Sequence, residues 1–255
     1  MINPKSATWR AGLLASCLFT GWLGSAAAAN LSQLAGISRN DQVGGLRLAL
    51  TQGAQSAVGK LGVADGFFGN PEVRIPLPGK LKKAESALRM LGYGSQVDGL
   101  VQSMNRAAEA AVPEAKVLLV DSIRQMSITD ATAILTGGPD SATQYFRRTT
   151  SAKLTGKFLP IVRRSTSQLG VAQRYNELGG KLAQAGLVGQ EESTIEGYVT
   201  QKTLDGLFLM IAREEAAIRS NPLGQSSKLL QKVFGAHRDD RDGRRGRGGV
   251  FPVTL

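Results

Sequence analysis

Apolar residues recur at intervals of three and four along almost the whole chain beyond residue 41. This spacing is typical of helices that bury one face and leave the other in water. Glycine or proline borders most of the runs, as expected at helix ends. The pattern predicts an all-α fold, a multi-helix bundle of about eight to ten helices. We expect helices over residues 43–61, 81–91, 97–111, 113–123, 129–136, 140–146, 151–169, 171–185, 204–218 and 229–234.

One segment, residues 67–78, breaks the helical period because it alternates apolar with polar residues and contains three prolines. A residue before proline avoids the helical conformation, so this segment should be extended. Pro76 and Pro78 cannot donate to a sheet, which leaves a minor edge strand or a polyproline-like strap over the helices. The simpler interpretation is a connector that packs three alternate side chains on the core: Val73, Ile75 and Leu77.

The first 29 residues have the three parts of a signal peptide. Lys5 and Arg10 precede an uncharged stretch over residues 11–23, and small residues fill positions 24–29. Glycine, serine, threonine and alanine dilute the stretch too much for a membrane anchor. We expect cleavage after Ala29 and export to the periplasm.

A lipoprotein is the alternative, because residues 14–17 have the shape of a lipoprotein box that ends in Cys17. Acylation there would tether the protein to a membrane. Two features argue against it. Only six residues separate Arg10 from Cys17, and the sequence stays apolar after the cysteine, where a lipoprotein usually turns polar. Cleavage after Ala29 removes the only cysteine, so no disulfide is expected.

The remaining chain divides into a helical domain over residues 30–236 and an Arg/Gly-rich tail over residues 237–255, which we expect to be disordered. The formal net charge of the whole 255-residue sequence is +11 and its pI is about 10.1, which favours anionic partners. Such a tail can bind RNA. Export argues against nucleic acid as a partner and favours anionic lipid or an envelope polymer.

Six short segments together form a recognisable pattern: GLRLAL at 45–50, NPEVRIPLP at 70–78, MNRAAEAA at 104–111, ATQYFR at 142–147, LDGLF at 204–208 and KVFG at 232–235. In these segments the chain resembles the bacterial family called domain of unknown function 4197, over about residues 31–235. The resemblance implies an exported helical protein of a Gram-negative bacterium. It implies no activity and no catalytic residue.

The composition excludes several kinds of active site. The only histidine, His237, lies in the tail, and no cysteine follows residue 29. Ser-His and Cys-His nucleophiles and zinc sites with histidine or cysteine ligands are therefore absent. We expect no cofactor, no metal and no catalytic residue. A Ser-Lys pair, an oxygen-ligand metal site or a carboxylate pair would still be possible. The carboxylate pairs to consider are Glu109 with Glu114, and Asp205 with Glu214 or Glu215.

Two polar groups lie within otherwise apolar helices and are candidate binding residues. Asn105, Arg106 and Glu109 lie within one helical turn or so of one another, and Lys202 and Asp205 form a second close pair. Each group is either an internal network that fixes helix register or the lining of a ligand pocket.

A basic segment between residues 141 and 176 contains no acidic residue. Its cations are Arg147, Arg148, Lys153, Lys157, Arg163, Arg164 and Arg174. Lys153, Lys157 and Arg164 fall on one helical stripe, beside the apolar residues Leu154, Phe158 and Ile161. Such a stripe suits an anionic lipid surface, or is simply a solvated face. We therefore expect a non-enzymatic binding or structural module of the cell envelope. The alternative is a carboxylate-dependent hydrolase of cell wall or lipid.

Overall fold

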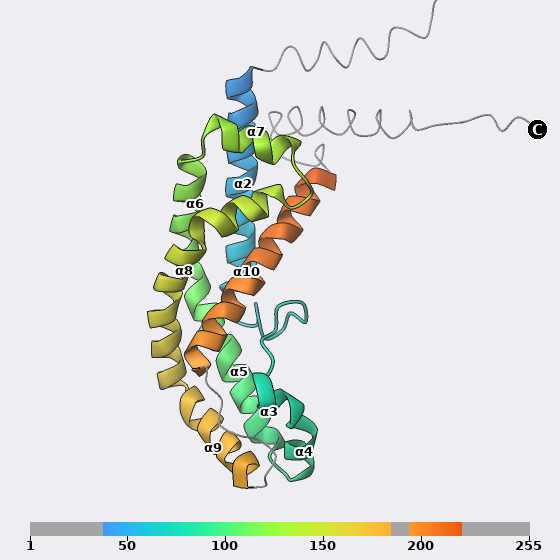
Figure 1. Cartoon of the computed structure of the whole chain (residues 1–255), viewed down its shortest axis with the longest axis vertical. Helices are drawn as coiled ribbons and strands as arrows, with labels where there is room; N and C mark the ends of the chain where they lie inside the picture. Colours follow the sequence, from blue (N-terminus) through green and yellow to red (C-terminus); the bar gives the residue numbers. More distant parts are fainter. Residues whose placement is uncertain (1–37, 185–193, 221–255) are drawn as a thin grey trace, which may run out of the picture. The chain divides into compact units, whose positions relative to one another are not determined.

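The computed structural model describes residues 38–184 and 194–220. Helices account for most of these residues and no strand occurs among them, so the all-α prediction is confirmed (Figure 1). The segments expected to be a signal peptide (1–29, with Cys17), a helix (229–234) and a disordered tail (237–255) lie outside the described residues. The elements are α2 (Arg39–Leu61), α3 (Gly79–Lys83), α4 (Glu85–Met90), α5 (Gly94–Ala111), the 3-10 turn η1 (Val112–Glu114), α6 (Ala115–Arg124), α7 (Ile128–Thr136), α8 (Ser141–Gln168), α9 (Val171–Gln184) and α10 (Ile195–Ser220).

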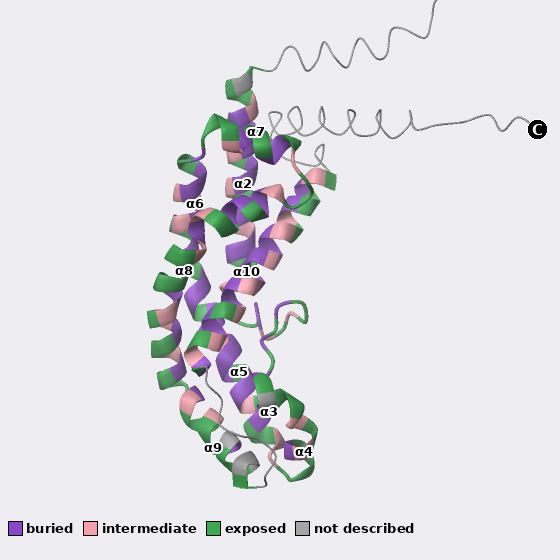
Figure 2. Ribbon diagram, in the orientation of Figure 1, coloured by how far each residue is buried: buried purple, intermediate pink, exposed green. Residues whose placement is uncertain are grey.

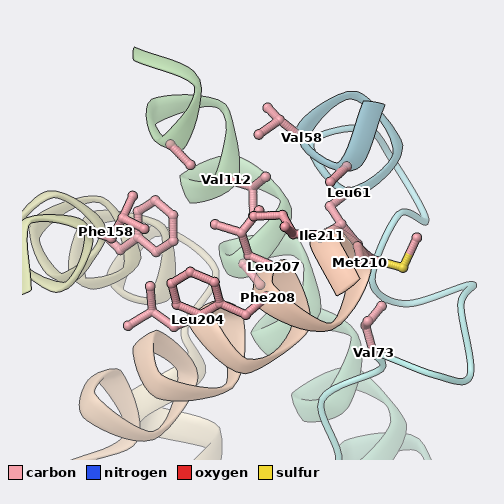
Figure 3. Close-up of a cluster of buried hydrophobic side chains, with 14 of the residues drawn as sticks. Val58, Leu61, Val73, Val112, Phe158, Leu204, Leu207, Phe208, Met210 and Ile211 are labelled. Atoms are coloured by element: carbon pink, nitrogen blue, oxygen red, sulfur yellow. The ribbon is translucent and has the colours of Figure 1, made fainter. Parts of the chain in front are cut away.

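The core lies between the longer helices. α10 packs on α8, α2 and α5, while α8 also packs on α5 and α6. Their apolar faces meet in one continuous cluster of buried residues, drawn in purple in Figure 2. Figure 3 shows Phe158 of α8 near Leu204 and Phe208 of α10 inside this cluster. No helix in the described ranges is long and apolar enough to cross a bilayer.

α8 is one helix where the sequence predicts two, over 140–146 and 151–169. A buried residue occurs at every fourth position from Phe146 to Thr166, so the core-facing side continues through the expected break. Pro160 lies inside the helix. A proline ring clashes with the carbonyl group four residues earlier and leaves it without a hydrogen bond. That residue is Gly156, which is exposed, so its carbonyl group can bond water instead.

Other helix ends differ from the prediction by a few residues. α2 begins at Arg39, four residues before the expected start, and is capped by Ser38, whereas α7 begins at Ile128, one residue early, and is capped by Ser127. The helix expected over 81–91 is divided into α3 and α4, and η1 precedes α6 at the position of Pro113. The spacing of apolar residues locates a buried face well, but it does not distinguish neighbouring polar residues as caps.

The segment over residues 70–78 is an irregular connector. The expected extended conformation over 67–78 is wrong for its first half, because residues 64–69 and 71–73 form turns, in which the N–H of Arg74 donates to the carbonyl oxygen of Asn70. Residues 74–78 form neither a helix nor a turn. Val73, Ile75 and Leu77 are buried whereas Arg74 and Pro76 are exposed, which confirms the predicted alternation. The edge strand that we considered does not form. The connector and the turn before it lie against α5 and α10, and the site described below begins there.

Candidate functional site

Asn105 joins α5 to the connector. Its side chain is completely buried. Oδ1 accepts a hydrogen bond from the backbone N–H of Ile75 at 2.8 Å, and Nδ2 donates to the carbonyl oxygen of Ile75 at 2.9 Å. Nδ2 also donates to the carbonyl oxygen of Val101 at 2.7 Å. The amide thus pairs with the backbone of Ile75 as a neighbouring strand would, in a region without a sheet.

Glu109, one turn further along α5, holds the turn that precedes the connector. Its Oε1 accepts hydrogen bonds from the backbone N–H groups of Phe67 at 3.0 Å and Phe68 at 3.1 Å. Its Oε2 accepts a hydrogen bond from Arg106 at 2.7 Å. Arg106 also donates to Asp65 at 2.8 Å. The bond to Glu109 is the main cause that raises the pKa of Arg106 above its ordinary value.

The structure therefore brings together the three residues predicted on α5, with one difference. Arg106 and Glu109 form the expected pair at i, i+3. Asn105 bonds to the connector and to the preceding turn of its own helix, whereas the spacing also allowed a contact with Glu109. Apart from the two bonds within α5, to Val101 and between Arg106 and Glu109, the hydrogen bonds of these side chains run to residues 65–75 of the chain. This arrangement matches an internal network more closely than the lining of a ligand pocket.

A second buried network, which we did not predict from the sequence, joins α10 to the start of α8. Glu215 accepts hydrogen bonds from the backbone N–H groups of Ala142 and Thr143 at 3.0 and 2.9 Å. Arg219 donates to Glu215 at 2.8 Å, to Ser141 Oγ at 2.8 Å and to the carbonyl oxygen of Ile134 at 3.0 Å. The sequence does indicate that Glu215 faces the core. Glu215 follows Ile211 by four residues and precedes Ile218 by three, so it occupies a core-facing position.

Most acids of the suggested carboxylate pairs bind cations. Glu109 and Glu215 bind Arg106 and Arg219, as described above. Lys202 binds Asp205 at 3.2 Å, and Lys60 binds Glu214 at 2.6 Å. Glu114 is exposed. Within the described ranges, no three histidine, cysteine or acidic residues are grouped closely enough to hold a metal ion.

The cations of α8 divide into two groups. Arg148 lies 3.3 Å from Asp130, and Arg147 stacks 4.6 Å from the ring centroid of Phe208. Beyond α8, Arg174 donates to Ser103 Oγ at 2.6 Å. In the second half of α8, four cations are exposed and form no ion pair with any described residue: Lys153, Lys157, Arg163 and Arg164. We call these four residues the basic face.

The apolar residues next to the basic face in the sequence are not exposed beside it. Leu154 and Phe158 are completely buried in the core, and Ile161 is half-buried. The sequence places them next to Lys153 and Lys157, but successive residues of a helix point about 100° apart. The basic face therefore offers charge without apolar side chains that could enter a bilayer.

Comparison with protein families decides the classification of the chain. A family model described as "Protein of unknown function (DUF4197)" matches residues 36–235, a range that contains every described helix. The chain belongs to this family. Membership in DUF4197 confirms the resemblance found in the six segments, and the family description assigns no activity. No curated protein and no solved structure matches the chain.

Proposed function

We propose that this DUF4197 protein is a non-enzymatic binding module that attaches to anionic, phosphate-bearing surfaces of the cell envelope through the basic face. The observation that carries the proposal is the group of four exposed cations within twelve residues of α8, without an ion-pair partner among the described residues. No acid occurs in the sequence from residue 141 to residue 176 to reduce their field. Unpaired cations on one helix face attract surfaces that carry many negative charges.

The expected affinity is low because the attraction is electrostatic alone. Each lysine or arginine near an anionic bilayer contributes about 1 kcal/mol, so four contribute about 4 kcal/mol, the free energy of a roughly millimolar complex. Attraction between exposed charges weakens beyond about 10 Å at 0.1 M salt. The proposed binding is therefore reversible, and we expect it to be strong only at low ionic strength.

Export is part of this proposal and rests on the signal-peptide pattern of residues 1–29. Mass spectrometry of the mature N-terminus tests it. A mature chain that begins at Asn30 would agree with cleavage after Ala29. A mature chain that begins at an acylated Cys17 would contradict it, because the protein would then be tethered to a membrane.

The binding test is co-sedimentation of residues 30–255 with lipid vesicles at low salt. We expect more protein to sediment with vesicles containing phosphatidylglycerol than with purely zwitterionic vesicles, and soluble polyphosphate should compete. Equal sedimentation with both kinds of vesicle would contradict the proposal. Sedimentation that polyphosphate does not reduce would show that lipid, rather than phosphate charge, is recognised.

The hydrolase alternative receives no support from the contacts of the acids. A carboxylate pair needs two acids that face one substrate. Here Glu109 and Glu215 bind arginines and backbone N–H groups, and Asp205 and Glu214 bind lysines. We propose a structural role for Asn105, Arg106 and Glu109, which hold the connector on α5.

A further inference from the structure

Two large apolar side chains project into solvent at the end of α4. Met90 is 82% exposed, and Leu91, the next residue, is 61% exposed. No other two consecutive large apolar residues are both exposed in the parts of the chain that the structure describes. Single exposed apolar residues are normal on a protein surface, whereas grouped ones can mark a contact with a protein or a membrane. We call Met90 and Leu91 the apolar tip.

The backbone turn that follows α4 causes this exposure. The N–H of Tyr93 donates to the carbonyl oxygen of Leu88 at 2.9 Å, and the N–H of Gly92 donates to that of Arg89 at 3.1 Å. Together with the left-handed conformation of Gly92, at a φ of 86°, these two bonds form a Schellman turn. Leu88 is completely buried and Tyr93 is half-buried. The residues between them, which form the apolar tip, therefore face outward.

Ion pairs hold this turn against α5. Arg89 pairs with Glu85 of its own helix at 3.1 Å and with Asp98 of α5 at 2.6 Å. α3, α4 and α9 lie together at one end of α5 (Figure 1). The apolar tip is thus fixed to a packed part of the domain, and we expect it to keep its outward orientation when it meets a partner.

Cations and an amphipathic ring accompany the apolar tip. Lys83, the last residue of α3, and Lys181 of α9 are exposed and form no ion pair with any described residue. Lys181 lies 3.9 Å from the ring centroid of Tyr93, two residues after the tip. Tyrosine has an apolar ring and a polar hydroxyl group, which suits the boundary between lipid and water. Apolar side chains beside cations match the surface of an anionic bilayer.

A protein partner fits the apolar tip less well than a bilayer does. A stable protein–protein interface buries about 800 Å² on each partner and involves roughly 20 to 30 residues a side. The tip consists of two side chains. A bilayer sets no such minimum, because each apolar side chain that enters it is removed from water on its own.

We propose that the apolar tip inserts into the headgroup region of an anionic lipid bilayer, with Lys83 and Lys181 against the lipid phosphates. This contact goes beyond the proposed function, because the basic face offers charge without apolar side chains. It shares with the proposed function only the choice of an anionic surface, and it involves other helices.

A single tryptophan at the tip tests the insertion. Both tryptophans of the sequence lie in residues 1–29, so residues 30–255, which contain the whole family match, have none. Met90→Trp therefore places one fluorophore at the tip. We expect water-like emission in solution, and a blue shift with protection from acrylamide when phosphatidylglycerol vesicles are added at low salt. The matched control is Ile128→Trp, at an exposed apolar residue of α7, for which we expect water-like emission throughout.

Three results of this experiment would overturn the proposal. The first is emission of Met90→Trp that the vesicles do not shift. The second is an equal shift for Ile128→Trp, because the added tryptophan itself would then drive the contact. The third is blue-shifted emission of Met90→Trp without vesicles, because another part of the protein or a second copy would then cover the tip.

A second measurement removes the tip and needs no fluorophore. We expect Met90→Ser combined with Leu91→Ser to weaken co-sedimentation with phosphatidylglycerol vesicles by about tenfold, because shallow insertion recovers part of the free energy of burying each side chain. Thermal unfolding should stay the same, since both side chains are exposed. Unchanged co-sedimentation of the double variant would overturn the proposal.

The two proposals fail in different ways. If Met90→Trp stays water-like while phosphatidylglycerol vesicles still sediment the protein, only the insertion of the tip is wrong. If Met90→Trp shifts but glutamine at positions 153, 157 and 164 leaves sedimentation unchanged, only the proposed role of the basic face is wrong.

Discussion

Glu215 caps the N-terminus of α8 from another helix, and two of the hydrogen bonds that it accepts there come from Thr143. Oε2 of Glu215 accepts hydrogen bonds from both the backbone N–H and the hydroxyl group of Thr143, each at 2.9 Å. Asp140, the residue at the cap position, makes no capping hydrogen bond with its own side chain. A carboxylate there satisfies N–H groups that lack helical partners and interacts favourably with the helix dipole. The contact fixes the start of α8 to the end of α10.

We predict that Glu215→Gln destabilises the domain by about 3 kcal/mol, since it leaves Arg219 buried without a countercharge. Urea unfolding of residues 30–255 measures this change. Glu214→Gln is the matched control because Glu214 pairs with the exposed Lys60, and such pairs contribute at most about 1 kcal/mol. Equal losses for the two variants would contradict a special role for Glu215.

Asn105 provides a local test of the connector. Asn105→Ala removes two hydrogen bonds to Ile75 and leaves buried backbone groups unpaired, each at a cost of about 1 to 3 kcal/mol. We expect lower stability and, more specifically, faster hydrogen exchange at the amide of Ile75. Unchanged protection of that amide would show that the bond to Asn105 does not hold the connector.

Two glycines in helices should respond to alanine in opposite directions. At Gly206 a Cβ atom would lie 2.7 Å from the ring of the fully buried Phe67, so we expect Gly206→Ala to destabilise the domain by about 1 to 3 kcal/mol. At Gly156 no atom lies within 4 Å of an added Cβ, and we expect Gly156→Ala to stabilise α8 by about 0.5 to 1 kcal/mol. Thermal unfolding compares the two, and shifts of the same sign would contradict the packing of Phe67 on α10.

The hydrogen bonds at the start of α7 should make the stability of the domain depend on pH. Hydrogen bonds from Ser127 to Asp130 lower the pKa of this carboxyl group below its ordinary value of 3.8, against the opposing effect of desolvation. A lowered pKa in the folded state means that the bond stabilises the protein above the ordinary pKa, and that this contribution disappears as the pH falls through the folded value. The difference in unfolding free energy between wild type and Asp130→Asn should therefore shrink below about pH 4. A constant difference down to pH 2 would contradict this account.

The sequence predicts the helices and the buried side of each one because apolar spacing records burial directly. Leu46, Leu100 and Phe208, for example, are all buried on the faces that their spacing indicates. The continuity of α8 is not predictable in the same way. The sequence prediction interrupts this helix over residues 147–150, and only the packing against neighbouring helices reveals a core that continues past this interval.

The candidate sites are predictable only in part, for a related reason. The spacing of Arg106 and Glu109 indicates a local pair, which forms. The partners of Asn105 and Glu215 lie 30 and 72 or 73 residues away, and no local pattern identifies such contacts. Leu154 directly follows Lys153 in the sequence. Only the packed structure shows that Leu154 lies in the core and that Lys153 lies in water.

The most direct test of the proposed function removes charge from the basic face. Lys153→Gln, Lys157→Gln and Arg164→Gln together should weaken binding to phosphatidylglycerol vesicles at low salt by about 3 kcal/mol, or about a hundredfold. The control removes three exposed cations elsewhere, with Lys83→Gln, Lys116→Gln and Arg124→Gln. We predict that the control variant retains most of the binding. Equal weakening of both variants would show that net charge, and not the basic face of α8, attracts the protein to the surface.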